Sequence, residues 1–178
     1  MTIFFTLLLA HLIADFPLQT NWIYAMKLKS NVGLVIHVLI HLIITSLLIR
    51  EPLTHWPLLA IIGTLHFLFD WLKLRYPTQK QVPGFLTDQA LHLSALLFGS
   101  VIFTNVQTVL SGWWLYVALL FAFVPPIIMI IWLLAIDVGR VRRQTDWFIF
   151  WAQRNLLMIS QHAGVPLLLV VGLGILLI

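Results

Sequence analysis

Six long apolar runs, almost free of charged residues, constrain the fold of this chain more than any other feature. They cover residues 3–24, 32–49, 57–74, 84–104, 112–136 and 147–178. A helix needs about 20 mostly apolar residues to cross the hydrocarbon core of a bilayer. Of the 178 residues, 61% are hydrophobic and 9% are charged, which leaves too few charges for the surface of a soluble domain. We therefore predict an all-α polytopic transmembrane helix bundle of about six spans, forming a single domain over residues 1–178.

The distribution of lysine and arginine predicts the orientation of the bundle. Basic residues follow the first, third and fifth apolar runs, whereas the alternate loops contain few. Loops rich in lysine and arginine remain on the cytoplasmic side, so both termini are predicted to be periplasmic if there are six spans. The predicted partner is the lipid bilayer. The net charge of +4 therefore reflects membrane topology, and nucleic acid is excluded as a partner.

Prolines divide two of the apolar runs. Pro125 and Pro126 predict a kink in the fifth span, because proline lacks the N–H that a helix interior requires. Gly164 and Pro166 divide the last run in the same way. Residues 147–178 are therefore either one span or an interfacial helix followed by a short terminal span.

The first four runs each carry a pair of ionisable residues spaced one helical turn apart. Residues at positions i and i+4 lie on the same face of a helix, and the order of pairs and basic loops places all four pairs in the cytoplasmic leaflet. An ionisable group inside the bilayer costs about 2.5–3.5 kcal/mol unless it is paired or coordinated. We therefore predict that these side chains form one metal site in the cytoplasmic half of the membrane, made of His11, Asp15, His37, His41, His66, Asp70, Asp88 and His92.

The spacing of these pairs also predicts an internal repeat. His11-x3-Asp15 recurs as His66-x3-Asp70 after 55 residues, and the pair of His37 and His41 is followed after 51 residues by Asp88 and His92. This pattern indicates a duplicated helical hairpin with a pseudo-two-fold axis along the membrane normal. Residues 1–104 would then form a four-helix core that holds the metal, and residues 105–178 would supply accessory helices.

The chemistry of the ligands favours hydrolysis. Cysteine is absent, so imidazole and carboxylate groups are the available ligands, and zinc is preferred while manganese and iron are compatible. Eight donors exceed the four that one zinc needs, so we expect two divalent ions, an arrangement that hydrolyses phosphoesters. Asp15, Asp70 and Asp88 are the expected catalytic carboxylates. Four further polar residues are expected to contact the ligands or a phosphate-bearing or lipid-linked substrate: Gln19, Gln89, Arg140 and Arg143.

Two other functions fit a membrane protein with this site. A metal-ion transporter or sensor would use similar ligands, although transport also needs polar groups along the whole path through the membrane. A redox enzyme with non-haem iron is the other alternative. Carboxylate-bridged iron bundles favour Glu-x-x-His, however, and the single glutamate of this chain, Glu51, is in a loop.

The ionisable pairs lie in segments that resemble a known protein family. The segments are His11-x3-Asp15-Phe-x2-Gln19, His37-x3-His41, His66-Phe-x2-Asp70 and Asp88-Gln89-x2-His92, within about residues 1–100. They resemble a family of small bacterial membrane proteins that is catalogued as a domain of unknown function. The pattern is similar, more remotely, to LexA-regulated inner-membrane proteins described as metal-dependent hydrolases. The first resemblance implies no particular activity, and the second implies a bacterial inner-membrane protein with hydrolase activity.

Overall fold

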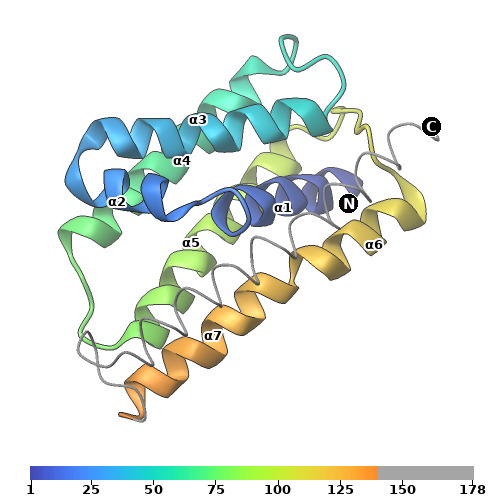
Figure 1. Cartoon of the computed structure of the whole chain (residues 1–178). Coiled ribbons are helices and arrows are strands. Elements are labelled where there is room, and N and C mark those ends of the chain that lie inside the picture. Colours follow the sequence, from blue (N-terminus) through green and yellow to red (C-terminus); the bar gives the residue numbers. More distant parts are fainter. Residues whose placement is uncertain (140–178) are drawn as a thin grey trace.

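Seven helices make up most of the described part of the chain. The computed structural model describes residues 1–139, and within them no strand forms apart from an isolated bridge between Ile49 and Thr108. The all-α prediction is confirmed for this range. The predicted run 147–178 and the predicted site residues Arg140 and Arg143 lie outside the described residues. The helices are α1 (Thr2–Asp15), α2 (Asn21–Lys29), α3 (Asn31–Leu48), α4 (Trp56–Arg75), α5 (Gln81–Ile102), α6 (Gly112–Ala122) and α7 (Val124–Asp137) (Figure 1).

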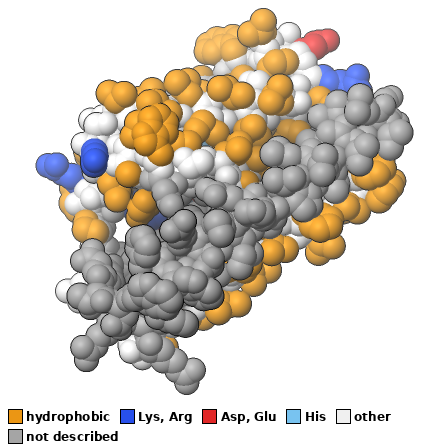
Figure 2. Space-filling view, viewed as in Figure 1, with side chains coloured by type: hydrophobic (Ala, Val, Ile, Leu, Met, Phe, Trp, Pro, Cys, Tyr) orange, Lys and Arg blue, Asp and Glu red, His pale blue; other side chains and the backbone are white. Residues whose placement is uncertain are grey.

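Four helical segments are long and apolar enough to cross a membrane. They are α3, α4, α5 and the continuous stretch Gly112–Asp137 that contains α6 and α7. Figure 2 shows hydrophobic side chains along the visible face outside the grey region, while charged side chains lie at its two ends. Many of the exposed side chains are large and apolar, including Ile43, Leu97, Leu120 and Ile131. A surface of this kind is suited to lipid, and the chain has the features of an integral membrane protein.

Helix α1 forms the centre of the molecule. It packs against α3, α5 and α6, and every residue from Thr6 to Ala14 is buried. Figure 1 shows α1 between α3 on one side and α6 on the other. A helix that is apolar on all sides is stable when other helices surround it, which is the position of α1 here.

The predicted helix over residues 3–24 is wrong in its length. α1 ends at Asp15, because Pro17 has no N–H to donate to the carbonyl oxygen of Ile13. The N–H of Leu18 donates to that oxygen instead, at 3.1 Å. A separate helix, α2, then begins after Thr20, whose hydroxyl oxygen accepts a hydrogen bond from the N–H of Ile23.

A helix boundary lies next to the proline pair, at the position where a kink was predicted. α6 ends at Ala122 and α7 begins at Val124, so that Pro125 and Pro126 occupy the start of α7. Proline is tolerated in the first turn of a helix, where its missing N–H would have no partner within the helix.

The first five helices position the ionisable pairs. α1 packs against α3, α3 against α4, α4 against α5, and α5 against α1, which closes a ring of four helices. The short helix α2 packs against α3 at the end of this ring, and α7 packs against α5 on the outside. The ionisable pairs lie in the interior of the ring.

Candidate metal centre

The structure brings all eight predicted ligands into one buried cluster. Each of α1, α3, α4 and α5 contributes one pair, as its i and i+4 spacing requires. Seven of the eight residues are no more than 5% exposed, and the Asp15 side chain is 10% exposed. The imidazole rings also pack against one another, with ring centroids 3.7 Å apart for His41 and His66 and 4.2 Å apart for His66 and His92.

One oxygen of Asp15 lies at the centre of the largest ligand group. Asp15 Oδ1 is 3.0 Å from His41 Nε2, 3.1 Å from His37 Nε2 and 3.8 Å from His66 Nε2. His37 Nε2 and His66 Nε2 are 3.2 Å apart. Zinc bonds of about 2.0–2.2 Å place two ligand atoms of a tetrahedral site about 3.3–3.6 Å from each other. The four ligand atoms all lie within 4.8 Å of one another, so small shifts of the side chains would bring them to this spacing and the residues could hold one ion.

His37 Nε2 has more close polar neighbours than one N–H group can satisfy. The single proton that a neutral imidazole can carry on Nε2 can be donated to one acceptor at good geometry. His37 Nε2, however, faces both Asp15 Oδ1 and His66 Nε2, and it also lies 3.4 Å from Asp70 Oδ2. A cation could accept lone pairs from Asp15 Oδ1 and from the imidazole nitrogens around it at the same time, so these residues could hold a metal ion.

A second group contains the remaining carboxylates. His92 Nε2 lies 3.4 Å from Asp88 Oδ1 and 3.8 Å from Asp70 Oδ1, and the three residues could together contact a cation. Among the described residues, His92 Nε2 and Asp88 Oδ1 are buried without a hydrogen-bond partner. His11 joins the two groups, because it forms a further possible ligand set with His66 and His92.

Two lysines that the sequence analysis did not assign to the site lie directly against these carboxylates. Lys27 Nζ of α2 is 2.6 Å from Asp70 Oδ2, and Lys73 Nζ of α4 is 2.5 Å from Asp88 Oδ2. The side chain of Lys27 is 7% exposed, whereas that of Lys73 is 42% exposed. In the sequence both are basic residues beside apolar runs, and no local spacing links either of them to its partner.

The two predicted glutamines lie beside the cluster. Gln89 Oε1 is 3.3 Å from His11 Nε2, and the Gln89 amide donates to Asp15 Oδ2 at 3.5 Å and to Asp88 Oδ2 at 3.4 Å. Gln19 Oε1 accepts a hydrogen bond of 3.3 Å from Lys27 Nζ. Gln89 thus links the two ligand groups, and Gln19 supports the lysine that faces Asp70.

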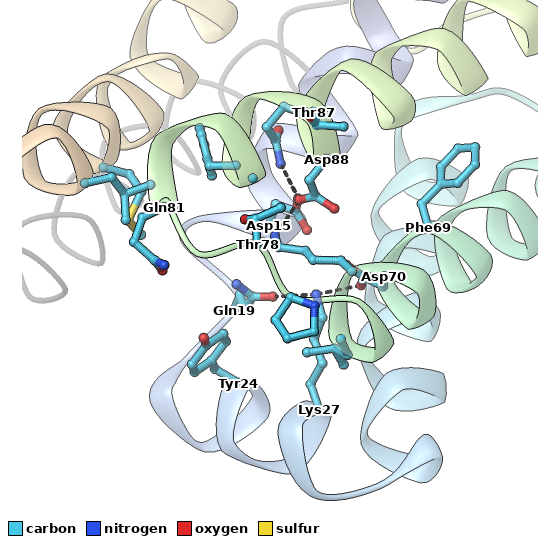
Figure 3. A pocket seen from close by; sticks show the side chains of 18 of the residues that line it. Asp15, Gln19, Tyr24, Lys27, Phe69, Asp70, Thr78, Gln81, Thr87 and Asp88 are labelled. Carbon is cyan, nitrogen blue, oxygen red and sulfur yellow. Dashed lines mark hydrogen bonds and ion pairs between the residues drawn. The ribbon is translucent and has the colours of Figure 1, made fainter. Parts of the chain in front are cut away.

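A cavity of about 850 Å³ opens beside the cluster. Figure 3 shows Lys27 reaching across it toward Asp70, with Gln19 next to the lysine and with Asp15 and Asp88 nearby. Its polar end is formed by these residues and by Lys73. Much of the remaining lining is apolar and includes an α7 wall together with Phe85 of α5; the α7 residues are Pro125, Ile128, Met129, Trp132 and Leu133.

The comparisons with known proteins support the resemblance to a domain of unknown function and give no support to the remoter one, to LexA-regulated hydrolases. No curated protein and no solved structure matches the chain. A family model described as a protein of unknown function, DUF3307, matches residues 3–121, a range that includes all eight residues of the cluster and both lysines. The chain therefore belongs to the DUF3307 family.

Proposed function

We propose that this protein is a membrane-embedded, metal-dependent hydrolase that acts on a phosphate-bearing amphiphile. The observation that carries the proposal is the spacing of Asp15 Oδ1 and the Nε2 atoms of His37, His41 and His66 beside a large cavity. Three imidazoles and one carboxylate suit zinc, and manganese or iron fits the same ligands.

The residues of the cluster have distinct roles in this proposal. Asp15, His37, His41 and His66 hold the cation, which lowers the pKa of water and polarises a phosphoryl oxygen when it is bound. Asp70 and Asp88 line the cavity and accept the proton of the attacking water. The water oxygen forms the new bond to phosphorus, the ester P–O bond breaks, and the leaving oxygen takes up a proton.

The shape of the cavity supports an amphiphilic substrate. The ammonium groups at its polar end complement an anionic head group, and the α7 wall complements an acyl or isoprenoid chain. Ligand cavities of about 300–1,000 Å³ are typical of sites that enclose a small molecule. A lipid-linked phosphate therefore fits both ends of this cavity.

The packing beyond the cluster argues against a metal transporter. On the side away from α2, the described core is apolar and includes Leu7, Leu58, Leu96 and Leu110. Three residues with hydroxyl groups, Thr6, Thr45 and Ser100, are also buried. The hydroxyl groups of Thr45 and Ser100 donate to carbonyl oxygens of their own helices, which leaves Thr6 as an isolated polar group of the described core. A transport path would need polar groups through this region, so the site is better suited to a reaction at one face of the membrane.

We further infer six spans, with a duplicated hairpin formed by α1 with α3 and by α4 with α5. The contacts of α1 with α5 and of α4 with α3 support the duplication, since a pseudo-two-fold axis would exchange them. Lys27, Lys29, Lys73 and Arg75 lie toward the same end of the bundle, which supports a cytoplasmic orientation of the cluster in a bacterial inner membrane.

The experiment that tests the function combines metal analysis with a hydrolysis assay. The full chain, purified in detergent, should contain zinc, manganese or iron and should release phosphate from phosphorylated lipids when that metal is present. Asp70→Asn should lose turnover while it retains the metal. Metal-replete protein that hydrolyses no phosphorylated amphiphile, or protein that binds no metal, would overturn the proposal.

A further inference from the structure

The two ligand groups correspond to each other under the inferred duplication. Asp15, His37 and His41 of the first hairpin correspond in order to Asp70, Asp88 and His92 of the second. Both triplets form compact groups of possible ligand atoms, each within 4.8 Å of one another. The cluster thus contains two related half-sites. The inference below rests on the proposed metal centre and concerns the number of ions that it binds.

The half-sites differ in the types of ligand that they contain. The first has one carboxylate and, with His66, three imidazoles. In the second, Asp88 occupies the position of His37, so this half-site has two carboxylates and one imidazole. The second half-site therefore carries one more negative charge than the first, when its carboxylates are ionised.

The lysines contact only the second half-site. Lys27 Nζ and Lys73 Nζ each lie against the Oδ2 atom of one of its carboxylates, at 2.6 and 2.5 Å. The ion pairs of Asp15 within the described residues involve histidines alone. Each half-site thus has a different source of positive charge available to it: a metal ion for the first, and two ammonium groups for the second.

The charge of the whole cluster favours a single ion. Three carboxylates and two ammonium groups give a net charge of −1 with neutral imidazoles, and one divalent cation changes this to +1. A second divalent cation would raise it to +3 in a buried environment, where unbalanced charge is costly. It would also lie close to two ammonium groups that already contact the carboxylates it needs.

We propose that the protein binds one divalent cation, at Asp15, His37, His41 and His66, and that Lys27 and Lys73 replace a second cation beside Asp70 and Asp88. Two atoms of the second half-site, His92 Nε2 and Asp88 Oδ1, are buried without a hydrogen-bond partner among the described residues. Because both lysines line the cavity, they are positioned to meet the anionic group of the substrate. In this site one metal ion and two ammonium groups bind the phosphate group. The two ammonium groups take the place of the second metal ion of a two-metal enzyme.

Metal stoichiometry tests this proposal directly. Full-length protein saturated with zinc and freed of excess metal should contain one zinc per chain by elemental analysis. The Lys27→Met, Lys73→Met double variant removes both ammonium groups and leaves all eight ligands, so its zinc content should rise to two per chain. The matched variant Lys29→Met, Lys80→Met changes two exposed lysines outside the cluster and should remain at one.

A second variant keeps the test decisive if the lysine variant does not fold. Asp70→Asn, Asp88→Asn should still contain one zinc, because it leaves the first half-site intact. Two zinc ions in the wild type, no increase in the folded lysine variant, or loss of zinc from the aspartate variant would each overturn the single-ion proposal. Absence of metal from every form of the protein would instead overturn the proposed metal centre itself.

Discussion

The ammonium group of Lys27 lies 2.6 Å from Asp70 Oδ2, although the two residues come from different helices, α2 and α4. Both side chains are almost completely buried. α2 is the short helix that folds across the end of the four-helix ring, so its packing against α3 determines where the lysine lies. This ion pair connects the short helix α2 with the candidate metal centre.

Removal of one partner of this ion pair should destabilise the protein strongly. Lys27→Met keeps most of the side-chain length and leaves Asp70 buried without its cation, which typically costs about 3–5 kcal/mol. The free energy of unfolding of metal-free protein in mixed micelles measures the effect. In a double-mutant cycle with Asp70→Asn, we expect a coupling energy of about 0.5–3 kcal/mol. Additive effects of the two substitutions on the free energy of unfolding would show that Lys27 and Asp70 do not interact.

Asp15→Asn should remove most of the metal binding. The substitution keeps the shape of the side chain but eliminates the negative charge that three imidazoles surround. Loss of an outer partner of a metal ligand costs about 10–100-fold in affinity, and loss of a charged ligand should cost more. Competition with a zinc chelator gives the affinity. The control is His55→Gln, which changes a histidine outside the cluster and should leave zinc affinity unchanged.

Gln89→Leu should weaken metal binding without abolishing it. The amide of Gln89 contacts His11 and donates hydrogen bonds to Asp15 and Asp88, so it orients groups of both half-sites. We expect an affinity loss of about 10–100-fold. The same chelator competition measures it, with Gln79→Leu in the exposed connection before α5 as control. Equal affinities of the two variants would show that Gln89 does not orient the ligands.

Gly33→Ala should displace α2 from α3. A Cβ atom at position 33 would collide with the backbone of Met26 and Lys27, and a backbone cannot move aside as a flexible side chain can. We expect a loss of stability of about 1–3 kcal/mol, together with a weaker Lys27–Asp70 coupling in the double-mutant cycle. Gly63→Ala is the matched control, because the nearest neighbours of its Cβ would be side-chain atoms of Leu42, the first at 3.1 Å. A larger loss of stability in Gly63→Ala than in Gly33→Ala would show that the contact at position 33 does not limit the packing of α2 on α3.

Asp137→Ala should loosen the start of α5. The Asp137 carboxylate at the end of α7 accepts hydrogen bonds from the N–H groups of Gln81 and Val82, both at 2.8 Å. These groups have no partner within their own helix, and loss of such a cap costs about 0.5–2 kcal/mol. Hydrogen exchange of the first turn of α5 should accelerate. The control is Val138→Ala, because Val138 is 65% exposed, and unchanged exchange in Asp137→Ala would exclude the capping role.

The sequence predicted the helices correctly where their positions follow from features within one segment, such as apolar length or proline. Apolar length identified α3, α4 and α5, and the proline pair identified the boundary between α6 and α7. The end of α1 was missed because Pro17 lies within an otherwise apolar segment, where length alone favoured a longer helix. α2 was missed for the same reason, since its first residues were included in the predicted first span.

The sequence by itself determined which ionisable side chains share a helix face, because residues four positions apart coincide after one turn of any α-helix. The tertiary structure alone decided which carboxylate each lysine contacts, and therefore how the two half-sites differ. Lys27 reaches Asp70 because α2 folds back against α3, and Lys73 reaches Asp88 across the junction of α4 and α5. Such contacts between helices depend on packing and loop geometry, which have no periodic signal in the sequence.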